Sequence, residues 1–208
     1  MGSRCLGAGG DFLKRFLFWL FSFLFCSILL SGCGKIQPES PMRQVVDDSG
    51  QSLSLPSHPS RIVSLTYGTD EILLGLVDTS RVAALSRYAG NPDISFVTKE
   101  EAEAVGRKVD VNAESIMALK PDLVIASTAV SPQLVSLLRQ SGIPVYVSLV
   151  AVSFDEMEEK VRGVARAVNE EAGGEAMVQD MENKKAKLEE KLSVIGPSGS
   201  GKSTLLNI

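Results

Sequence analysis

The sequence predicts an α/β fold, with a single Rossmann-like lobe whose short parallel sheet is flanked by helices and followed by a long helix. Short apolar runs rich in β-branched residues alternate with segments of helical periodicity between residues 62 and 168, which is typical of a parallel sheet covered on both faces. Residues 175–192 then form a charged helical pattern with an apolar stripe. No second series of strands follows this pattern in the sequence.

A βα unit opens the predicted sheet. The apolar run at residues 62–65 predicts a buried strand, and apolar residues at helical spacing from 72 to 76 predict a helix. We expect the polar stretch at 66–69 between them to be a turn. Ligands of open α/β sheets bind beside the carboxyl ends of the strands. Tyr67 is therefore expected to line a binding mouth, with Glu71 on its rim.

Further strands and helices follow from the same patterns. Apolar residues on both sides of the turn-rich stretch 47–50 predict an opening β-hairpin. Later strands are expected at residues 82–85, 123–126 and 145–149. Capping residues predict helices that begin near Asn112, Ser131 and Ser153. Gly173-Gly174 is expected to break the last of these helices from the long helix.

Composition excludes several classes of function. The chain has 208 residues, 44% of them hydrophobic, and a formal net charge of -4, which argues against nucleic-acid binding. Its three cysteines, Cys5, Cys26 and Cys33, all lie near the amino terminus. They leave no disulfide framework or cysteine-rich metal site for the rest of the chain. The only histidine, His58, lies in a proline-flanked turn, so no metal site is assigned to it.

The amino terminus has the pattern of an export signal. Lys14 and Arg15 precede residues 16–30, which carry no charge and are too few for a membrane span of about 20 residues. The run ends in Leu30-Ser31-Gly32-Cys33, which resembles a bacterial lipobox. The resemblance implies a signal peptide at 1–32, lipidation of Cys33 and a tether at 33–43. The alternative is an ordinary signal peptide with a chance cysteine.

Five candidate binding residues follow the predicted strands. They are Tyr67 after the first parallel strand, Arg87 and Tyr88 after the second, and Ser127 and Thr128 after the third. The carboxyl ends of parallel strands share one edge, so these residues should converge there. A tyrosine ring suits a large ring system or a chelate, and an arginine can hold a carboxylate through two hydrogen bonds. The alternative is that they are loop residues without a ligand.

The order and spacing of several segments resemble the substrate-binding proteins of ABC importers for ferric siderophores, haem and cobalamin. The segments are Pro59-Ser60-Arg61-Ile62-Val63-Ser64-Leu65, Thr69-Asp70-Glu71-Ile72-Leu73, Asn112-Ala113-Glu114-Ser115-Ile116 and Leu119-Lys120-Pro121-Asp122-Leu123-Val124-Ile125-Ala126. The resemblance implies two α/β lobes joined by a long helix, with the ligand between them. Residues 44–172 would be the N-terminal lobe and 173–193 the start of the connecting helix. The second lobe is missing from the sequence, so weak ligand binding or none is expected.

The same resemblance gives Glu71 a role. In the family, a glutamate at this position pairs with arginines of the membrane permease, and complementary charge of this kind guides docking. The alternative is a first-turn glutamate that only stabilises its own helix. A matching glutamate from a second lobe has no counterpart here, so single-ended docking is expected to be weak.

The segment 194–208 carries a different motif. It satisfies the phosphate-loop pattern G-x-x-x-x-G-K-S and resembles the Walker A segment of ABC transporter ATPases. Its nucleotide-binding residues would be Gly196, Gly199, Gly201, Lys202, Ser203 and Thr204. No Walker B carboxylate follows, and an exported lipoprotein does not meet cytoplasmic ATP, so ATP is not the expected ligand. An ATP-binding fragment of an ABC ATPase is nevertheless the alternative function.

The resemblance to substrate-binding proteins implies a non-enzymatic solute-binding component of an ABC importer. It would be exported and lipid-anchored to a bacterial membrane, facing the periplasm or the cell exterior. Its ligand would be an iron chelate, either a siderophore or haem, or cobalamin, and its partner would be the permease. A lipid-anchored decoy that docks on the permease without cargo is a third hypothesis.

Overall fold

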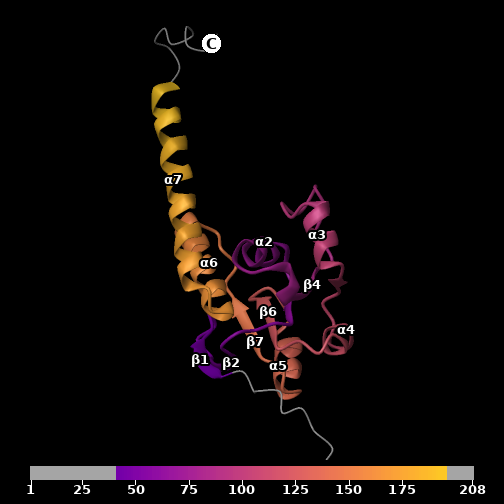
Figure 1. The fold of residues 1–208 in the computed structure, drawn as a ribbon. Coiled ribbons are helices and arrows are strands. Elements are labelled where there is room, and N and C mark those ends of the chain that lie inside the picture. The colour runs from indigo at the N-terminus through magenta and orange to yellow at the C-terminus, as the bar shows by residue number, and fades with distance from the viewer. Residues whose placement is uncertain (1–40, 196–208) are drawn as a thin grey trace, which may run out of the picture. The chain divides into compact units, whose positions relative to one another are not determined.

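A computed structural model describes residues 41–195, which contain a β-hairpin and a five-stranded sheet (Figure 1). The hairpin pairs β1 (Met42–Val46) with β2 (Ser52–Pro56) in antiparallel fashion. The sheet has the order β5-β4-β3-β6-β7 and all its ladders are parallel. Its strands are β3 (Ile62–Ser64), β4 (Val82–Ser86), β5 (Lys108–Val109), β6 (Leu123–Ser127) and β7 (Val145–Ser148). The predicted hairpin and the α/β fold are confirmed, and β1 begins two residues before the predicted lobe boundary.

Helices cover both faces of the sheet. They are α2 (Tyr67–Leu76), the 3-10 helix η1 (Thr79–Arg81), α3 (Lys99–Val105), α4 (Ala113–Ala118), α5 (Pro132–Gln140), α6 (Phe154–Val168) and α7 (Glu171–Ile195). Side chains alternate between the faces along each strand. Ile62 and Ile125 therefore join a core with α2 and α6, whereas Val63 and Val124 join a second core with α4 and α5. The strands β3, β4, β6 and β7 are apolar up to a final serine because both faces of the sheet are covered.

Helix α2 begins earlier than the sequence predicted. The stretch 66–69 was expected to be a turn, but Thr66 is the N-cap and Tyr67 is already helical. The carbonyl oxygen of Thr66 accepts hydrogen bonds from the backbone N–H groups of Thr69 (3.1 Å) and Asp70 (3.0 Å). The Thr69 hydroxyl lies 2.7 Å from that of Ser64 at the end of β3. These polar residues form the first helical turn because their side chains find partners on the strand.

The sequence patterns did not predict three short elements: the 3-10 helix η1, helix α3 and strand β5. Strand β5 is only two residues long, which is too short for an alternating pattern. Helix α3 has few apolar residues, yet its start carries a capping box: the Thr98 hydroxyl accepts from Glu101 N–H, and the Glu101 carboxylate accepts from Thr98 N–H. The T-x-x-E spacing could therefore have identified this helix.

The predicted break at Gly173-Gly174 is wrong. Helix α6 ends at Val168, where Asn169 takes a left-handed conformation (φ 63°), and both glycines lie inside α7. A Cβ atom on Gly174 would lie 2.5 Å from the Cβ of Ala165. Gly174 is thus needed for the close approach of α7 to α6 and does not end a helix.

Replacing Gly174 by alanine should lower the free energy of unfolding by about 1–3 kcal/mol, because the added methyl group overpacks the contact with Ala165. Gly173→Ala is the matched control, since its Cβ would meet the flexible end of Leu76 at 3.4 Å and the Cβ of Glu170 at 4.0 Å, which are both ordinary contacts. The control should be neutral or raise stability by up to about 1 kcal/mol through helix propensity. Urea unfolding measures both variants, and equal effects would contradict the packing of α7 on α6.

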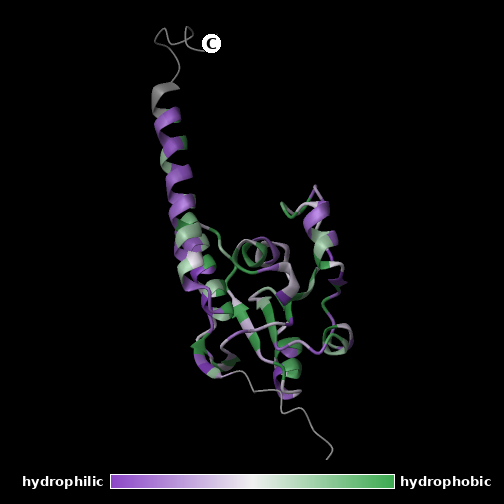
Figure 2. Ribbon diagram, in the orientation of Figure 1, coloured by the Kyte–Doolittle hydropathy of each residue, from purple (hydrophilic) through white to green (hydrophobic). Residues whose placement is uncertain are grey.

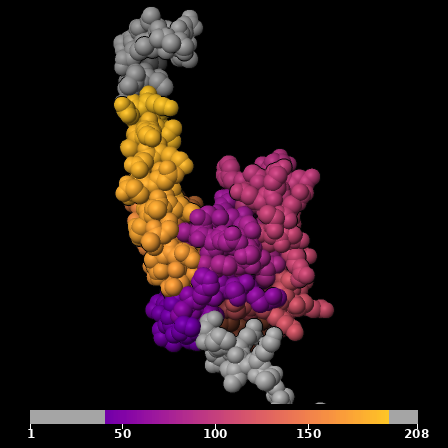
Figure 3. All heavy atoms as spheres, viewed as in Figure 1, coloured from indigo at the N-terminus to yellow at the C-terminus, as the bar shows by residue number. Residues whose placement is uncertain are grey.

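The outer part of α7 makes no buried contact. Every residue from 182 to 192 is exposed, and this part of the helix is mainly hydrophilic (Figure 2). In the space-filling view it forms a column of atoms that runs beyond the lobe (Figure 3). Among residues 41–195, no helix combines the length and apolar character that a membrane crossing requires.

Candidate functional site

The carboxyl edge of the sheet collects most of the residues predicted to bind a ligand. All five strands are parallel, so their carboxyl ends lie along one edge. Tyr67 follows β3, Arg87 and Tyr88 follow β4, Asp110 follows β5 and Thr128 follows β6. The expectation that one edge carries these residues is met by the topology.

Three of the predicted residues are in direct contact and are called here the tyrosine cluster: Tyr67, Arg87 and Tyr88. The two rings meet edge to face, with centroids 6.4 Å apart and an interplanar angle of 85°. Arg87 Nη2 donates a hydrogen bond to the Tyr88 hydroxyl (2.7 Å), and its guanidinium lies 4.9 Å from the centroid of that ring. Asp110 lies 3.8 Å from Arg87. The cluster offers aromatic surface, one cation and hydroxyl groups.

A buried carboxylate fixes the strand that precedes the cluster. Asp70, in the first turn of α2, is inaccessible to solvent and accepts hydrogen bonds from the hydroxyl (2.6 Å) and N–H (3.1 Å) of Ser86. Burial raises the pKa of Asp70 to about 6, although hydrogen bonds from Ser64 and Ser86 oppose the rise. Ser86 is the last residue of β4, so Asp70 positions the backbone that leads into Arg87 and Tyr88.

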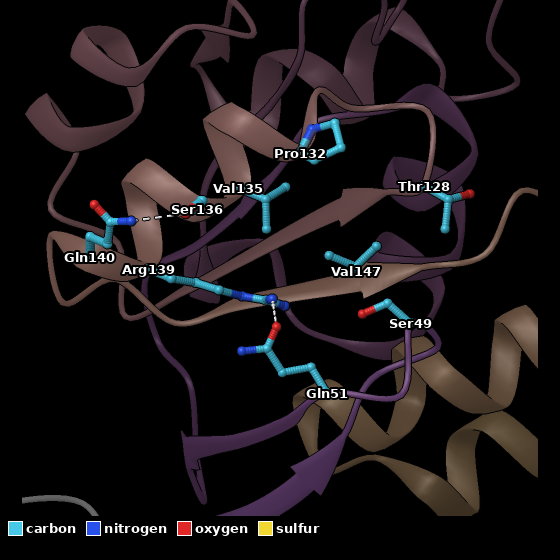
Figure 4. Close-up of a pocket in the computed structure, with 9 residues that line it drawn as sticks. All are labelled: Ser49, Gln51, Thr128, Pro132, Val135, Ser136, Arg139, Gln140 and Val147. Carbon is cyan, nitrogen blue, oxygen red and sulfur yellow. Dashed lines mark hydrogen bonds between the residues drawn. The ribbon is translucent and has the colours of Figure 1, made fainter.

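The two residues after β6 lie in different surroundings from the tyrosine cluster. Ser127 is buried, and its hydroxyl accepts a hydrogen bond from Ala129 N–H (3.3 Å), as in a turn. Thr128 lies at one end of a separate pocket of about 660 Å³ (Figure 4). Helix α5, strand β7 and the hairpin turn line this pocket, and no residue of the tyrosine cluster does. The structure therefore does not bring Thr128 into contact with the tyrosines.

Glu71 holds a loop. Its carboxylate accepts hydrogen bonds from the N–H of Phe96 (2.9 Å) and the hydroxyl of Ser95 (3.4 Å). It also lines a shallow pocket of about 230 Å³ with Leu74 and Phe96. Phe96 itself is 91% exposed. The role of Glu71 in permease docking stays a prediction, and the structure adds a local role for its carboxylate.

Exposed apolar side chains gather on segments that follow the strands. Among residues 41–192, twelve large apolar side chains are exposed, and half of them lie on segments that follow strands of the parallel sheet. These six are Tyr67, Ile94, Phe96, Val111, Val150 and Val152. Apolar side chains collected at one edge are typical of a surface that binds a partner or a ligand.

Two predicted sites fall outside the described residues. They are the lipidation site Cys33, with the signal peptide and most of the tether, and the nucleotide-binding residues of the segment 196–204. The described part of α7 ends at Ile195, directly before that segment.

A family match decides the classification of this fold. A model of the periplasmic binding protein family matches residues 62–201, which include the whole parallel sheet and α7. The chain belongs to this family. The match confirms the resemblance to substrate-binding proteins that the sequence showed for this part of the chain.

The two relatives described here are lipoproteins of one bacterium. An uncharacterised ABC transporter substrate-binding lipoprotein of Bacillus subtilis is 28% identical over 88% of this chain and 60% of its own length. A probable siderophore-binding lipoprotein of the same organism is 27% identical over 86% of this chain and 57% of its own length. The chain therefore spans somewhat more than half the length of these relatives.

A solved structure supports the same fold. The apo form of a periplasmic haem-binding protein from a Roseiflexus species is 27% identical, with a TM-score of 0.53. The similarity covers 62% of this chain and 48% of that protein.

Proposed function

We propose that this chain is a solute-binding component of an ABC importer and that it binds a metal chelate at the carboxyl edge of its sheet. The observation that carries the proposal is the tyrosine cluster, in which two aromatic rings and a guanidinium meet at that edge. The rings suit the flat face of a large chelate, and Arg87 suits its acidic groups. The exposed apolar side chains of the same edge extend the surface.

Several finer parts of the function belong to the same proposal. The ligand is a ferric siderophore, haem or cobalamin. The names of the probable siderophore-binding lipoprotein and of the haem-binding neighbour support the first two of these ligands. The protein acts by binding and delivering its ligand rather than by catalysis. Anchoring through a lipid on Cys33 would hold it at the membrane, and Glu71 would contact the permease through complementary charge.

Titration of the full chain with haemin, a ferric hydroxamate siderophore and cyanocobalamin tests the proposal. Calorimetry and ligand absorbance are the readouts, and Mg-ATP is the fourth titrant. We expect one chelate to bind. A response to Mg-ATP alone would refute the proposal and favour the phosphate-loop alternative. A response to none of the four would refute ligand binding and favour the decoy that docks on the permease without cargo.

Removing both rings of the tyrosine cluster should weaken the binding of that chelate. The double variant Tyr67→Ala/Tyr88→Ala is expected to raise its Kd at least about tenfold, which corresponds to about 1.4 kcal/mol of lost contact. Leu137→Ala is the matched control, because Leu137 is also exposed and apolar but lies on α5. An unchanged Kd in the double variant would place the ligand elsewhere.

A further inference from the structure

The first turn of α2 carries unused hydrogen-bond donors. The side chain of Thr66, the N-cap, bonds to the Thr69 hydroxyl (2.8 Å) and caps no backbone N–H group. Within residues 41–195, the N–H groups of Tyr67 and Gly68 have no acceptor. Free N–H groups and the positive end of the helix dipole together favour an anion at such a helix start.

A buried cation lies beside these donors. Lys160 on α6 is only 7% exposed, and its Nζ lies 3.0 Å from the position that a Cβ atom of Gly68 would occupy. No hydrogen bond or ion pair joins this amine to any residue that the structure describes. Lysines are almost never buried to this degree without a partner. The missing Cβ of Gly68 leaves the space in which the amine lies next to the helix start.

The nearest carboxylates do not satisfy the amine. Burial lowers the pKa of Lys160, and the charges of Glu71 and Asp48 only partly oppose this effect. Glu71 accepts from Phe96 N–H (2.9 Å). Asp48 accepts from the Tyr146 hydroxyl (2.7 Å) and from a backbone N–H of the segment after β7. A bound anion would supply the missing partner and would favour the protonated amine.

We propose that the N–H groups of Tyr67 and Gly68 and the amine of Lys160 form a subsite for a carboxylate of the ligand. The inference rests on the proposed function, because it places a negatively charged group of the chelate at the start of α2, where Tyr67 lies. It narrows the ligand to chelates that carry free carboxylates, such as haem with its propionates. Chelates whose periphery is neutral gain nothing from this subsite.

The subsite itself is tested with citrate, which needs no chelate. Citrate is added to the ¹⁵N-labelled full chain at constant ionic strength, and the amide signals of Tyr67 and Gly68 are followed by NMR. Both signals should shift and saturate. Lys160→Met should raise the apparent Kd at least about tenfold, while Lys187→Met, an exposed lysine of α7, should leave it unchanged. Absence of a shift in the unmodified chain, or an equal shift in Lys160→Met, would overturn the subsite.

Methionine is apolar and close to lysine in shape, so the buried position should accept it. The citrate titration of the unmodified chain tests the subsite even if the variant does not fold. Haemin and its dimethyl ester then test the carboxylate. Haemin should bind at least about tenfold more tightly than the ester in the unmodified chain, and this preference should be smaller in Lys160→Met. If citrate shifts the amides but no chelate binds, the subsite stands and the proposed function fails. If a chelate binds but citrate has no effect, the subsite fails and the proposed function stands.

Discussion

Replacing Asp47 by alanine should lower the free energy of unfolding by about 3–5 kcal/mol. The Asp47 side chain is inaccessible to solvent, and its Oδ2 atom lies 2.6 Å from Nη2 of Arg139 on α5. Its Oδ1 atom accepts hydrogen bonds from the N–H (3.0 Å) and hydroxyl (2.6 Å) of Ser49 and from Gln51 N–H (2.9 Å). The variant leaves the largely buried guanidinium of Arg139 without its carboxylate partner and leaves the Ser49 and Gln51 donors without their acceptor. The contacts that join the hairpin to the edge of the sheet are thereby lost.

Equilibrium urea unfolding followed by circular dichroism measures this loss. Asp180→Ala is the matched control, because the Asp180–Lys184 pair on α7 is exposed and should contribute no more than about 0.5 kcal/mol. Burial alone would raise the pKa of Asp47, but hydrogen bonds from Ser49, Gln51, Arg139 and Val147 hold it below its ordinary value of 3.8. The stability that Asp47 contributes is thus present above pH 3.8, and the difference between wild type and variant should shrink below it. A loss below 1 kcal/mol at pH 7 would contradict the proposed role of the pair.

Lowering the pH from 7 to 5 should stabilise the protein through Asp70 by about 1 kcal/mol. The pKa of Asp70 is about 6 in the folded chain and 3.8 in the unfolded chain, so folding takes up a proton over this range. A carboxylic acid with a raised pKa favours the folded state as the pH falls, which is the opposite of the behaviour of Asp47. Over the whole range below both pKa values the gain reaches about 3 kcal/mol.

The Asp70→Asn variant identifies the group responsible. Asparagine keeps an acceptor oxygen for Ser86 and cannot ionise, so the rise in stability between pH 7 and pH 5 should disappear. Urea unfolding at several pH values provides the measurement for both proteins. A pH dependence that is identical in wild type and variant would show that another group takes up the proton.

The strands and most helices were predictable because their signals are local. The buried strands read as apolar runs, and the helices α5 and α6 begin at Ser131 and Ser153 as expected. The failures come from contacts between elements, which no local pattern shows. The pair of glycines in α7 suggests a break unless the contact of Gly174 with Ala165 is known. The polar start of α2 looks like a loop until its partners on β3 are known.

The candidate site was predictable only in part. The contact between Tyr67 and Tyr88 follows from a general property of parallel sheets, so the order of strands and loops was sufficient. The pairing of Asp47 with Arg139 joins residues 92 positions apart, and no sequence pattern predicts it. The burial of Lys160 could not be predicted for a different reason. Its neighbours on α6 form an ordinary amphipathic pattern, and only the packing against Gly68 reveals that the side chain of Lys160 is buried.

Amide mapping by NMR tests most directly whether the ligand lies at the carboxyl edge of the sheet. The chelate that binds in the titrations is added to the ¹⁵N-labelled full chain, and the residues whose signals change are located on the fold. The changes should be largest at residues 65–68 and 86–88, around the tyrosine cluster. Changes centred instead on Val135 and Arg139, in the pocket between α5 and β7, would contradict the claim.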